Sequence, residues 1–372
     1  MLNLIEERIS KFRKKLKQNN LDSFLVLHAE NRGYLSGYTA EDTGFEESAG
    51  ALIISADHLI LATDSRFELQ AAKEAPMYEV RCYKTGISET ITDFLKETNI
   101  KKIGFESNRM SYSQYCKIKE ILNSENITTE FNPADSLMSN LRIIKSDFEI
   151  VQIKKALRIA EEAFSSIKAT LKPGMVEKDI AWQLEKNIRE LGAEGLSFPP
   201  IVASGPNSAL PHAIAGERQI GVNEPLLFDW GAKLNGYCSD TSRTLILGKP
   251  DKKFNEVYKI LFDAQKMAIE AVKPGTSTKK VDSIARDHID KNGYGKKFGH
   301  GLGHGVGLEI HEPPRVSPLR ETTLEPGMVI TIEPGIYIPD WGGIRLENMV
   351  LVTQNGAEVL NSLSYNDNII EI

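Results

Sequence analysis

Four acidic residues in the C-terminal half of the sequence interrupt segments whose composition predicts buried β-strands. Asp229 lies among large apolar residues in PLLFDWGAKL, and Asp240 is expected on the return strand, after the turn signal Asn235-Gly236. Glu333 and Glu347 occupy matching places in a second hairpin, GMVITIEPGIYIPDWGGIRLENMVLV. Carboxylates in the core are costly to bury unless they are protonated, paired with cations or bound to metal.

Binding to metal ions explains the burial of these four carboxylates better than pairing with basic residues does. Only Arg243 and Arg345 are basic and close by in these strands, which is too few for four carboxylates. A fifth ligand is expected from KKFGHGLGHGVGLEIHEPP, which contains His300, His304 and His311 among glycines that let the backbone approach a metal closely. Four or five such ligands suit a pair of Mn, Co, Zn or Fe ions about 3.5–4 Å apart.

The elements that must position these residues form an internal repeat. A helix, Lys172-Pro173-Gly174 and a second helix recur 101 positions later as a helix, Lys273-Pro274-Gly275 and a second helix. We expect two ααβ units packed about a pseudo-two-fold axis, with a site in the crevice between them. The first helix is predicted to begin at the capping-box pattern of Ser146 and Glu149 and to end at Lys172-Pro173-Gly174.

The first 130 or so residues alternate short β-rich runs with helical ones, which predicts a small α/β domain. Strands are expected within 23–29, 50–56, 58–63, 78–83 and 101–107, and helices over the first 20 residues and at 65–75, 87–98 and 111–123. This part has no His, Cys or acidic cluster with ligand-like spacing, so we expect it to supply shape, specificity or oligomer contacts. The stretch 132–146 is the expected connection, so the domains are predicted at 1–135 and 136–372.

Composition excludes several classes of protein. The 45 basic and 51 acidic residues give a net charge of −6, which argues against a broad surface for nucleic acid or anionic lipid. No stretch approaches the roughly 18 apolar residues of a membrane span, and the amino-terminal segment lacks the apolar region of a signal peptide. Cys82, Cys116 and Cys238 do not form a disulfide framework, so a cytoplasmic location is expected.

Taken together, these motifs resemble the pita-bread metallopeptidases, the family of methionine aminopeptidase, prolidase, Xaa-Pro aminopeptidase and creatinase. The resemblance is closest to the proline-specific branch, through PHA (211–213), FDWGAKLNGYCSDTSRT (228–244), GHGLGHGVGLEIHEPP (299–314), TIEPGIY (331–337) and GGIRLEN (342–348). NRGYLSGY (31–38), TDSRF (63–67) and LRIIKSDFEI (141–150) resemble the creatinase/prolidase N-terminal domain. The implied fold is therefore an α/β N-terminal domain followed by an α+β pita-bread catalytic domain.

The resemblance also implies a metal-ligand set and a reaction. Two divalent cations, Mn or Co before Zn or Fe, would be bound by Asp229, Asp240, His304, Glu333 and Glu347, with Asp240 and Glu347 bridging them. A metal-bridging hydroxide would attack the carbonyl of an Xaa-Pro bond in a proline-containing peptide. Neither a nucleic acid nor a membrane is an expected partner, whereas a second copy of the chain, giving a homodimer, is.

Other residues take supporting roles by the same resemblance. Glu333 is the expected proton shuttle, and His212 and His311 are expected to bind the substrate amide and the oxyanion. Arg345 is expected to steady the site or to meet a substrate carboxylate. His300 is expected to support the site from outside the ligand set, and Cys238 to be a small core residue.

Several alternatives stay open at the level of sequence. A prolidase and an Xaa-Pro aminopeptidase differ in how the space beyond proline is closed, which the sequence does not reveal, although the short chain slightly favours dipeptides. A same-fold non-peptidase, such as a creatinase-like C–N hydrolase or a lyase, and a non-enzymatic binding protein are the rivals. Proteins of both alternative classes typically lack some of the metal ligands, whereas all five ligands are present in this sequence.

Overall fold

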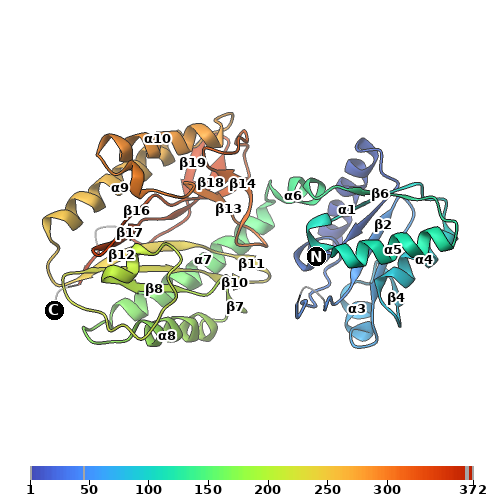
Figure 1. Ribbon diagram of the computed structural model, residues 1–372, viewed down its shortest axis with the longest axis horizontal. Coiled ribbons are helices and arrows are strands. Elements are labelled where there is room, and N and C mark those ends of the chain that lie inside the picture. Colours follow the sequence, from blue (N-terminus) through green and yellow to red (C-terminus); the bar gives the residue numbers. More distant parts are fainter. Residues whose placement is uncertain (1, 45–46, 365–367, 371–372) are drawn as a thin grey trace. The chain divides into compact units, whose positions relative to one another are not determined.

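The computed structural model describes residues 2–44, 47–364 and 368–370. Contacts divide the chain into two units, one that reaches Leu141 and one that begins at Arg142 (Figure 1). Among the helices of the described residues, none is both long and apolar enough to cross a membrane.

The N-terminal unit is a six-stranded sheet with helices around it. Its strand order is β4-β3-β2-β1-β5-β6, and β2 runs antiparallel to β1 and β3 whereas the remaining pairs are parallel. The strands are β1 (Ser23–Val26), β2 (Ala51–Ser55), β3 (Leu59–Thr63), β4 (Glu79–Cys82), β5 (Lys102–Phe105) and β6 (Glu130–Pro133). The helices are α1 (Leu2–Gln18), α2 (Ala29–Ser36), α3 (Glu68–Glu74), α4 (Ile87–Glu97), α5 (Tyr112–Ser124) and α6 (Ser136–Arg142), the last of which leads into the second unit.

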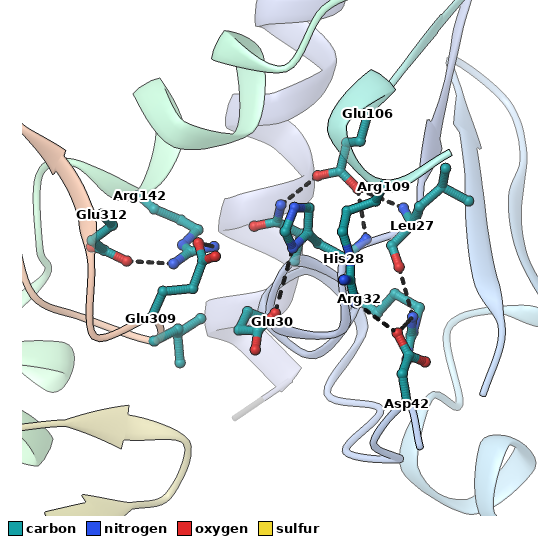
Figure 2. A network of polar contacts seen from close by, with 12 residues as sticks. Leu27, His28, Glu30, Arg32, Asp42, Glu106, Arg109, Arg142, Glu309 and Glu312 are labelled. Atoms are coloured by element: carbon teal, nitrogen blue, oxygen red, sulfur yellow. Dashed lines mark hydrogen bonds and ion pairs between the residues drawn. The ribbon is translucent and has the colours of Figure 1, made fainter. Parts of the chain in front are cut away.

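Helix α2 was not predicted, because polar contacts rather than an apolar periodicity hold it. Arg32 is fully buried, and its guanidinium donates to Asp42 Oδ1 at 2.7 Å and to the Leu27 carbonyl at 2.7 Å (Figure 2). The carboxylate of Glu106 accepts from the backbone N–H of Leu27 at 2.6 Å and from the Asn31 side chain. The predicted strands and the predicted helices α1, α3, α4 and α5 are confirmed, whereas β6 was missed and α6 lies in the stretch expected to be a connection.

The C-terminal unit contains the predicted repeat of helix pairs. Helices α7 (Asp147–Lys168) and α8 (Glu177–Glu190) pack in one apolar core, and α9 (Lys252–Ala271) and α10 (Thr278–Lys291) in another. Each end of α10 lies 101 positions beyond the corresponding end of α8, as the sequence repeat predicts. In Figure 1 the strands of this unit lie between α8 on one side and α9 and α10 on the other.

The strands of this unit form two main sheets. One has the order β20-β12-β9-β8, from β8 (Ile201–Ser204), β9 (Pro225–Trp230), β12 (Thr241–Leu247) and β20 (Ile369–Ile370). The other has the order β14-β13-β15-β18-β19, from β13 (Gly303–Gly305), β14 (Glu312–Val316), β15 (Val329–Ile332), β18 (Asn348–Thr353) and β19 (Gly356–Val359). Smaller ladders join β7 (Gly195–Leu196), β10 (Ala232–Leu234) and β11 (Tyr237–Cys238), and separately β16 (Gly335–Ile338) and β17 (Gly342–Arg345).

Local sequence signals fix most turns and helix ends of this unit. The capping box of Ser146 and Glu149 is present at the start of α7, and Asn235-Gly236 adopts φ angles of 50° and 80°, as a type I′ turn requires. The predicted end of α7 at Lys172-Pro173-Gly174 is wrong, since the helix ends at Lys168. The last turn tightens into i→i−3 bonds, such as Thr170 N–H to the Ile167 carbonyl, because Pro173 lacks an N–H and its ring would clash with the carbonyl of Ala169, four residues earlier, in a continued helix.

Candidate metal centre and active-site cavity

The five predicted metal ligands lie within or directly beside strands of the C-terminal unit. Asp229 lies within β9, and His304 lies within β13. Asp240 falls between β11 and β12, Glu333 follows β15, and Glu347 falls between β17 and β18. The expectation that all four acids lie inside strands is therefore wrong for three of them. A strand end frees a side chain from the alternation of the pleat, so the three carboxylates can turn toward a common point.

Three of these residues come close enough to share one ion. One ligand atom each from Asp240, His304 and Glu347 can be chosen so that all lie within 4.8 Å of one another. The Nε2 atom of His304 lies 3.5 Å from Asp240 Oδ2 and 3.3 Å from Glu333 Oε1. Asp240, His304 and Glu347 are buried, whereas the side chains of Asp229 and Glu333 are 15% and 16% exposed.

The imidazole of His304 is oriented as a metal ligand. Its Nδ1 atom lies 3.1 Å from the Gly305 carbonyl, a contact that requires a proton on Nδ1. In the neutral ring, Nε2 then carries a lone pair that faces the carboxylates of Asp240 and Glu333. A lone pair directed at two anions needs a cation between them, and hydrogen bonding through the other ring nitrogen is typical of metal-bound histidine.

Two carboxylate oxygens of the cluster also lack donors. Among the described residues, nothing donates a hydrogen bond to Asp229 Oδ1 or to Glu347 Oε1, although both atoms are buried. The second oxygen of each group is satisfied, since Asp229 Oδ2 accepts from Arg345 and Glu347 Oε2 accepts from the Ser242 hydroxyl at 2.9 Å. Buried unsatisfied oxygens are rare in native proteins, and bound cations account for them here.

The electrostatics of the cluster lead to the same conclusion. Burial, followed by the charge of neighbouring carboxylates, raises the pKa of Asp240 and of Glu347 well above its usual range. Carboxylates at such short range cannot all be ionised without positive charge among them. The residues therefore fit divalent cations.

Arg345 orients Asp229 rather than facing open space. Its guanidinium is 3% exposed and donates to Asp229 Oδ2 at 2.6 Å, to the Tyr337 hydroxyl at 2.8 Å and to Ser242 Oγ at 2.8 Å. A further bond reaches the Pro211 carbonyl at 3.2 Å. Because these donors are already engaged, the geometry favours the first of the two roles expected for Arg345, steadying the site.

His300 supports this arrangement from the other side of Tyr337. The Tyr337 hydroxyl accepts from Arg345, so its own proton is available to His300 Nε2 at 3.0 Å. His300 Nδ1 then carries the ring proton and donates to the Gly301 carbonyl at 2.8 Å. Burial lowers the pKa of His300, which favours this neutral ring. Tyr337 and Ser242 were missed from the sequence, because only their contacts with Arg345 distinguish them from ordinary strand residues.

A cavity of about 570 Å³ opens above the cluster. His212, His311 and Arg315 line it, and all three side chains are exposed. The ring of His311 packs edge-on against that of His304, with centroids 4.3 Å apart. Although part of the His311 side chain is exposed, the partial burial of its ring lowers its pKa to about 4, so the ring is neutral near pH 7. Arg315 was not predicted, since nothing in the sequence sets it apart from a surface arginine.

The lining of the cavity also includes apolar residues, namely Phe198, Pro199, Pro200, Ile214 and Ile310. Cys238 does not line it, and its side chain packs with Tyr237, Val306 and Met349 in an apolar core, as a small core residue would. The cavity thus joins a cluster of acids and histidines to an apolar surface, an arrangement that suits binding of a small substrate with apolar parts.

Four carboxylates and one imidazole come together here, and two further histidines line the adjoining cavity. Such a cluster is typical of hydrolases that use divalent metal ions. Comparison with known proteins makes the class specific. The family model described as Metallopeptidase family M24 matches residues 151–354, and that of the Creatinase/Prolidase N-terminal domain matches residues 8–144. The chain belongs to metallopeptidase family M24, and the predicted fold class, family and enzyme class are confirmed.

Relatives resemble the chain over nearly its whole length. The Xaa-Pro dipeptidase of Pyrococcus furiosus is 40% identical over 356 residues, covering 96% of this chain and 98% of that protein. The solved structure of an Xaa-Pro dipeptidase from Bacillus anthracis matches with a TM-score of 0.91 at 38% identity, covering 98% of this chain and 100% of that one. An X-Pro aminopeptidase from Thermotoga maritima matches with a TM-score of 0.88 at 34% identity, covering 97% and 99% of the two chains.

Proposed function

We propose that this protein hydrolyses the bond between an amino-terminal residue and a following proline, and that dipeptides are its main substrates. Hydrolysis of Xaa-Pro bonds is supported by the similarity to Xaa-Pro dipeptidases and an X-Pro aminopeptidase over nearly the whole chain. The preference for dipeptides is supported by one residue of the cavity, Arg315.

Arg315 faces the metal cluster across two strands. It is the direct partner of His304 in the antiparallel pair of β13 and β14, so the two side chains project from the same face. Arg315 forms no ion pair within the part of the chain that the structure describes, and its side chain is exposed on the cavity wall. A free guanidinium suits a carboxylate, and a dipeptide presents its terminal carboxylate immediately beyond proline. A longer peptide presents an uncharged amide at that place.

The metal ligands in this proposal are Asp229, Asp240, His304, Glu333 and Glu347, and the ions are two divalent cations. Mn or Co is the first choice for their identity, with Zn or Fe as alternatives, because carboxylate ligands with one imidazole suit all four. Such a pair of cations supplies a nucleophile from water near neutral pH and polarises a carbonyl group.

The protein's own groups bind the peptide and move protons. Glu333 accepts a proton from the nucleophilic water and delivers it to the proline nitrogen as the bond breaks. His212 and His311 border the cavity, where they bind the substrate amide and the oxyanion that develops at the carbonyl. Arg345 keeps Asp229 fixed through these steps.

The homodimer and the cytoplasmic location expected from the sequence stay predictions. Sedimentation of the purified protein at several concentrations tests the first of them.

Paired substrates test the preference for dipeptides. Metal-loaded protein is given Leu-Pro, Leu-Pro amide and Leu-Pro-Ala, with Arg315→Gln beside the wild type. We expect the wild type to prefer Leu-Pro, and Arg315→Gln to raise KM for Leu-Pro roughly 10-fold while leaving the amide nearly unchanged, since a charge-assisted bond contributes about 1.5–3 kcal/mol. Equal cleavage of all three would indicate an aminopeptidase, and cleavage of none would refute the proposed reaction.

A further inference from the structure

Glu312 is a buried carboxylate that lies outside the metal cluster. Its side chain is 3% exposed and forms ion pairs with Lys145 Nζ at 2.7 Å and with the guanidinium of Arg142. Figure 2 shows Glu312 and Arg142 pointing toward each other, with Glu309 beside them. Arg142 and Lys145 are themselves buried and belong to the segment where the C-terminal unit begins. This cluster of three charges, Arg142, Lys145 and Glu312, is unusual because none of its members takes part in the chemistry proposed above.

The residue before Glu312 is His311, and the two face opposite ways. Glu312 begins β14, in which buried and exposed residues alternate strictly. His311 lies in the bend that leads directly into β14, so the position of Glu312 at the start of the strand determines where the backbone places His311. His311 is indeed exposed on the cavity wall, with its ring against that of His304. The direction of His311 is therefore tied to the burial of its neighbour.

The backbone alone does not fix this part of β14. The pairing of β13 with β14 is irregular: His304 faces Arg315, but the next residue, Gly305, faces Glu312. Bulges of this kind leave several registers available unless a side chain selects one. The connection from Gly305 to Glu312 also closes around the carboxylate, since a Cβ added at Gly307 would overlap the Glu312 side chain. The segment from Gly305 to Glu312 therefore packs around the carboxylate of Glu312.

Stability is not a sufficient reason for such a cluster. Buried ion pairs often contribute no more to stability than apolar residues of the same volume would, but they are directional. Here the cation partners come from the start of the C-terminal unit, and the carboxylate comes from the first residue of β14, more than 160 positions later in the chain. These ion pairs thus hold the start of β14, next to His311, against the first residues of the C-terminal unit.

We propose that Glu312 is a positioning residue, which holds His311 at the metal cavity through its buried contacts with Arg142 and Lys145. The proposal deepens the function given above and rests on it for the role of His311. Glu312 itself does not touch the substrate.

A double-mutant cycle separates positioning from general stability. Glu312→Gln, His311→Ala and the double variant are assayed on Leu-Pro at equal metal content. We expect Glu312→Gln to lower kcat about 10-fold with little change in KM, and to have less than about a 2-fold effect when His311 is already alanine, because residues that act as a unit are not additive. An equal loss in both backgrounds would overturn the proposal. Glu358→Gln, which breaks an exposed ion pair with Lys154, is the matched control and should leave kcat unchanged.

A spectroscopic measurement tests the proposal without activity. In metal-free protein, the ring Cε1–H resonance of His311 should shift in Glu312→Gln, whereas that of His58, in the N-terminal unit, should stay in place. An unshifted His311 resonance would overturn the proposal, even if the wild type cleaves Xaa-Pro bonds. If the wild type cleaves none, the proposed function fails and the resonance still decides whether Glu312 positions His311. Should Glu312→Gln fail to fold, Glu312→Asp, which keeps the charge, and Lys145→Gln replace it in both measurements.

Discussion

Arg345 and Asp229 form a buried ion pair at the edge of the metal cluster, with Nη2 of the arginine 2.6 Å from Oδ2 of the aspartate. The pair leaves Asp229 Oδ1 without a donor among the described residues, so that this oxygen is available for a cation. The guanidinium thus determines which oxygen of Asp229 faces the metal site. Its other bonds, to Tyr337 and Ser242, fix the guanidinium in turn.

Arg345→Lys should therefore impair metal binding as well as catalysis. A lysine is a single point charge that cannot bond Asp229, Tyr337 and Ser242 at once, so Asp229 loses its fixed orientation. We expect roughly a 10-fold or larger loss of kcat/KM and weaker retention of one metal, on the scale of a lost charge-assisted bond. Equilibrium dialysis followed by elemental analysis measures the metal. Arg189→Lys, on the surface of α8, is the control, and full metal content with unchanged activity in Arg345→Lys would contradict the prediction.

Tyr337→Phe should reproduce the effect of removing His300. Among the described residues, the Tyr337 hydroxyl is hydrogen-bonded to both His300 and Arg345. Removing the hydroxyl or the His300 ring therefore breaks the same connection. We expect each single variant to lower kcat about 3- to 10-fold, and the double variant to be little worse than either, as for residues in one network. Rates measured at saturating substrate test this, and multiplicative losses would show that the two residues act independently.

Metal binding should release protons. Because burial and neighbouring carboxylates raise the pKa of Asp240 and Glu347, these groups hold protons in the metal-free protein that a cation must displace. Affinity for Mn is therefore expected to rise with pH. Titration calorimetry in two buffers of different ionisation enthalpy measures the protons released per ion. Identical apparent enthalpies in the two buffers would count against the raised pKa values.

The raised pKa of Glu347 also affects the stability of the metal-free protein. A carboxyl group whose pKa is raised by folding contributes stability below its unfolded value, about 4, and that contribution falls as the pH rises toward the folded pKa. Glu347→Gln removes the titration, so the metal-free variant should gain thermal stability relative to metal-free wild type as the pH rises from 5 to 8. Scanning calorimetry at several pH values measures the difference in Tm. A difference that stays constant or shrinks with pH would contradict this prediction.

The sequence predicted much of the site because its signals are local. The turn residues Asn235-Gly236, the capping box at Ser146 and the repeated helix pairs each follow from short-range preferences, which the structure preserves. The acidic residues were recognisable because carboxylates are conspicuous in apolar segments.

What the sequence did not predict depends on contacts between distant positions. Arg315 is distinguished only by its pairing with His304 across the sheet, and Tyr337 only by its bonds to Arg345 and His300. Helix α2 was missed for the same reason, since Arg32 and Asn31 hold it through tertiary hydrogen bonds rather than through an apolar face. Such residues look ordinary until the fold brings their partners together.

Metal-dependent cleavage of Leu-Pro tests the central claim most directly. Chelator-treated protein is assayed alone, with Mn or Co restored, and as Glu347→Gln under the same conditions. We expect no activity without metal, recovery as two ions bind per chain, and a loss of at least about 100-fold in Glu347→Gln, because a residue that binds the metal is removed. Protein that holds two ions and leaves every Xaa-Pro peptide intact would contradict the central claim, and would favour a non-peptidase with the same fold.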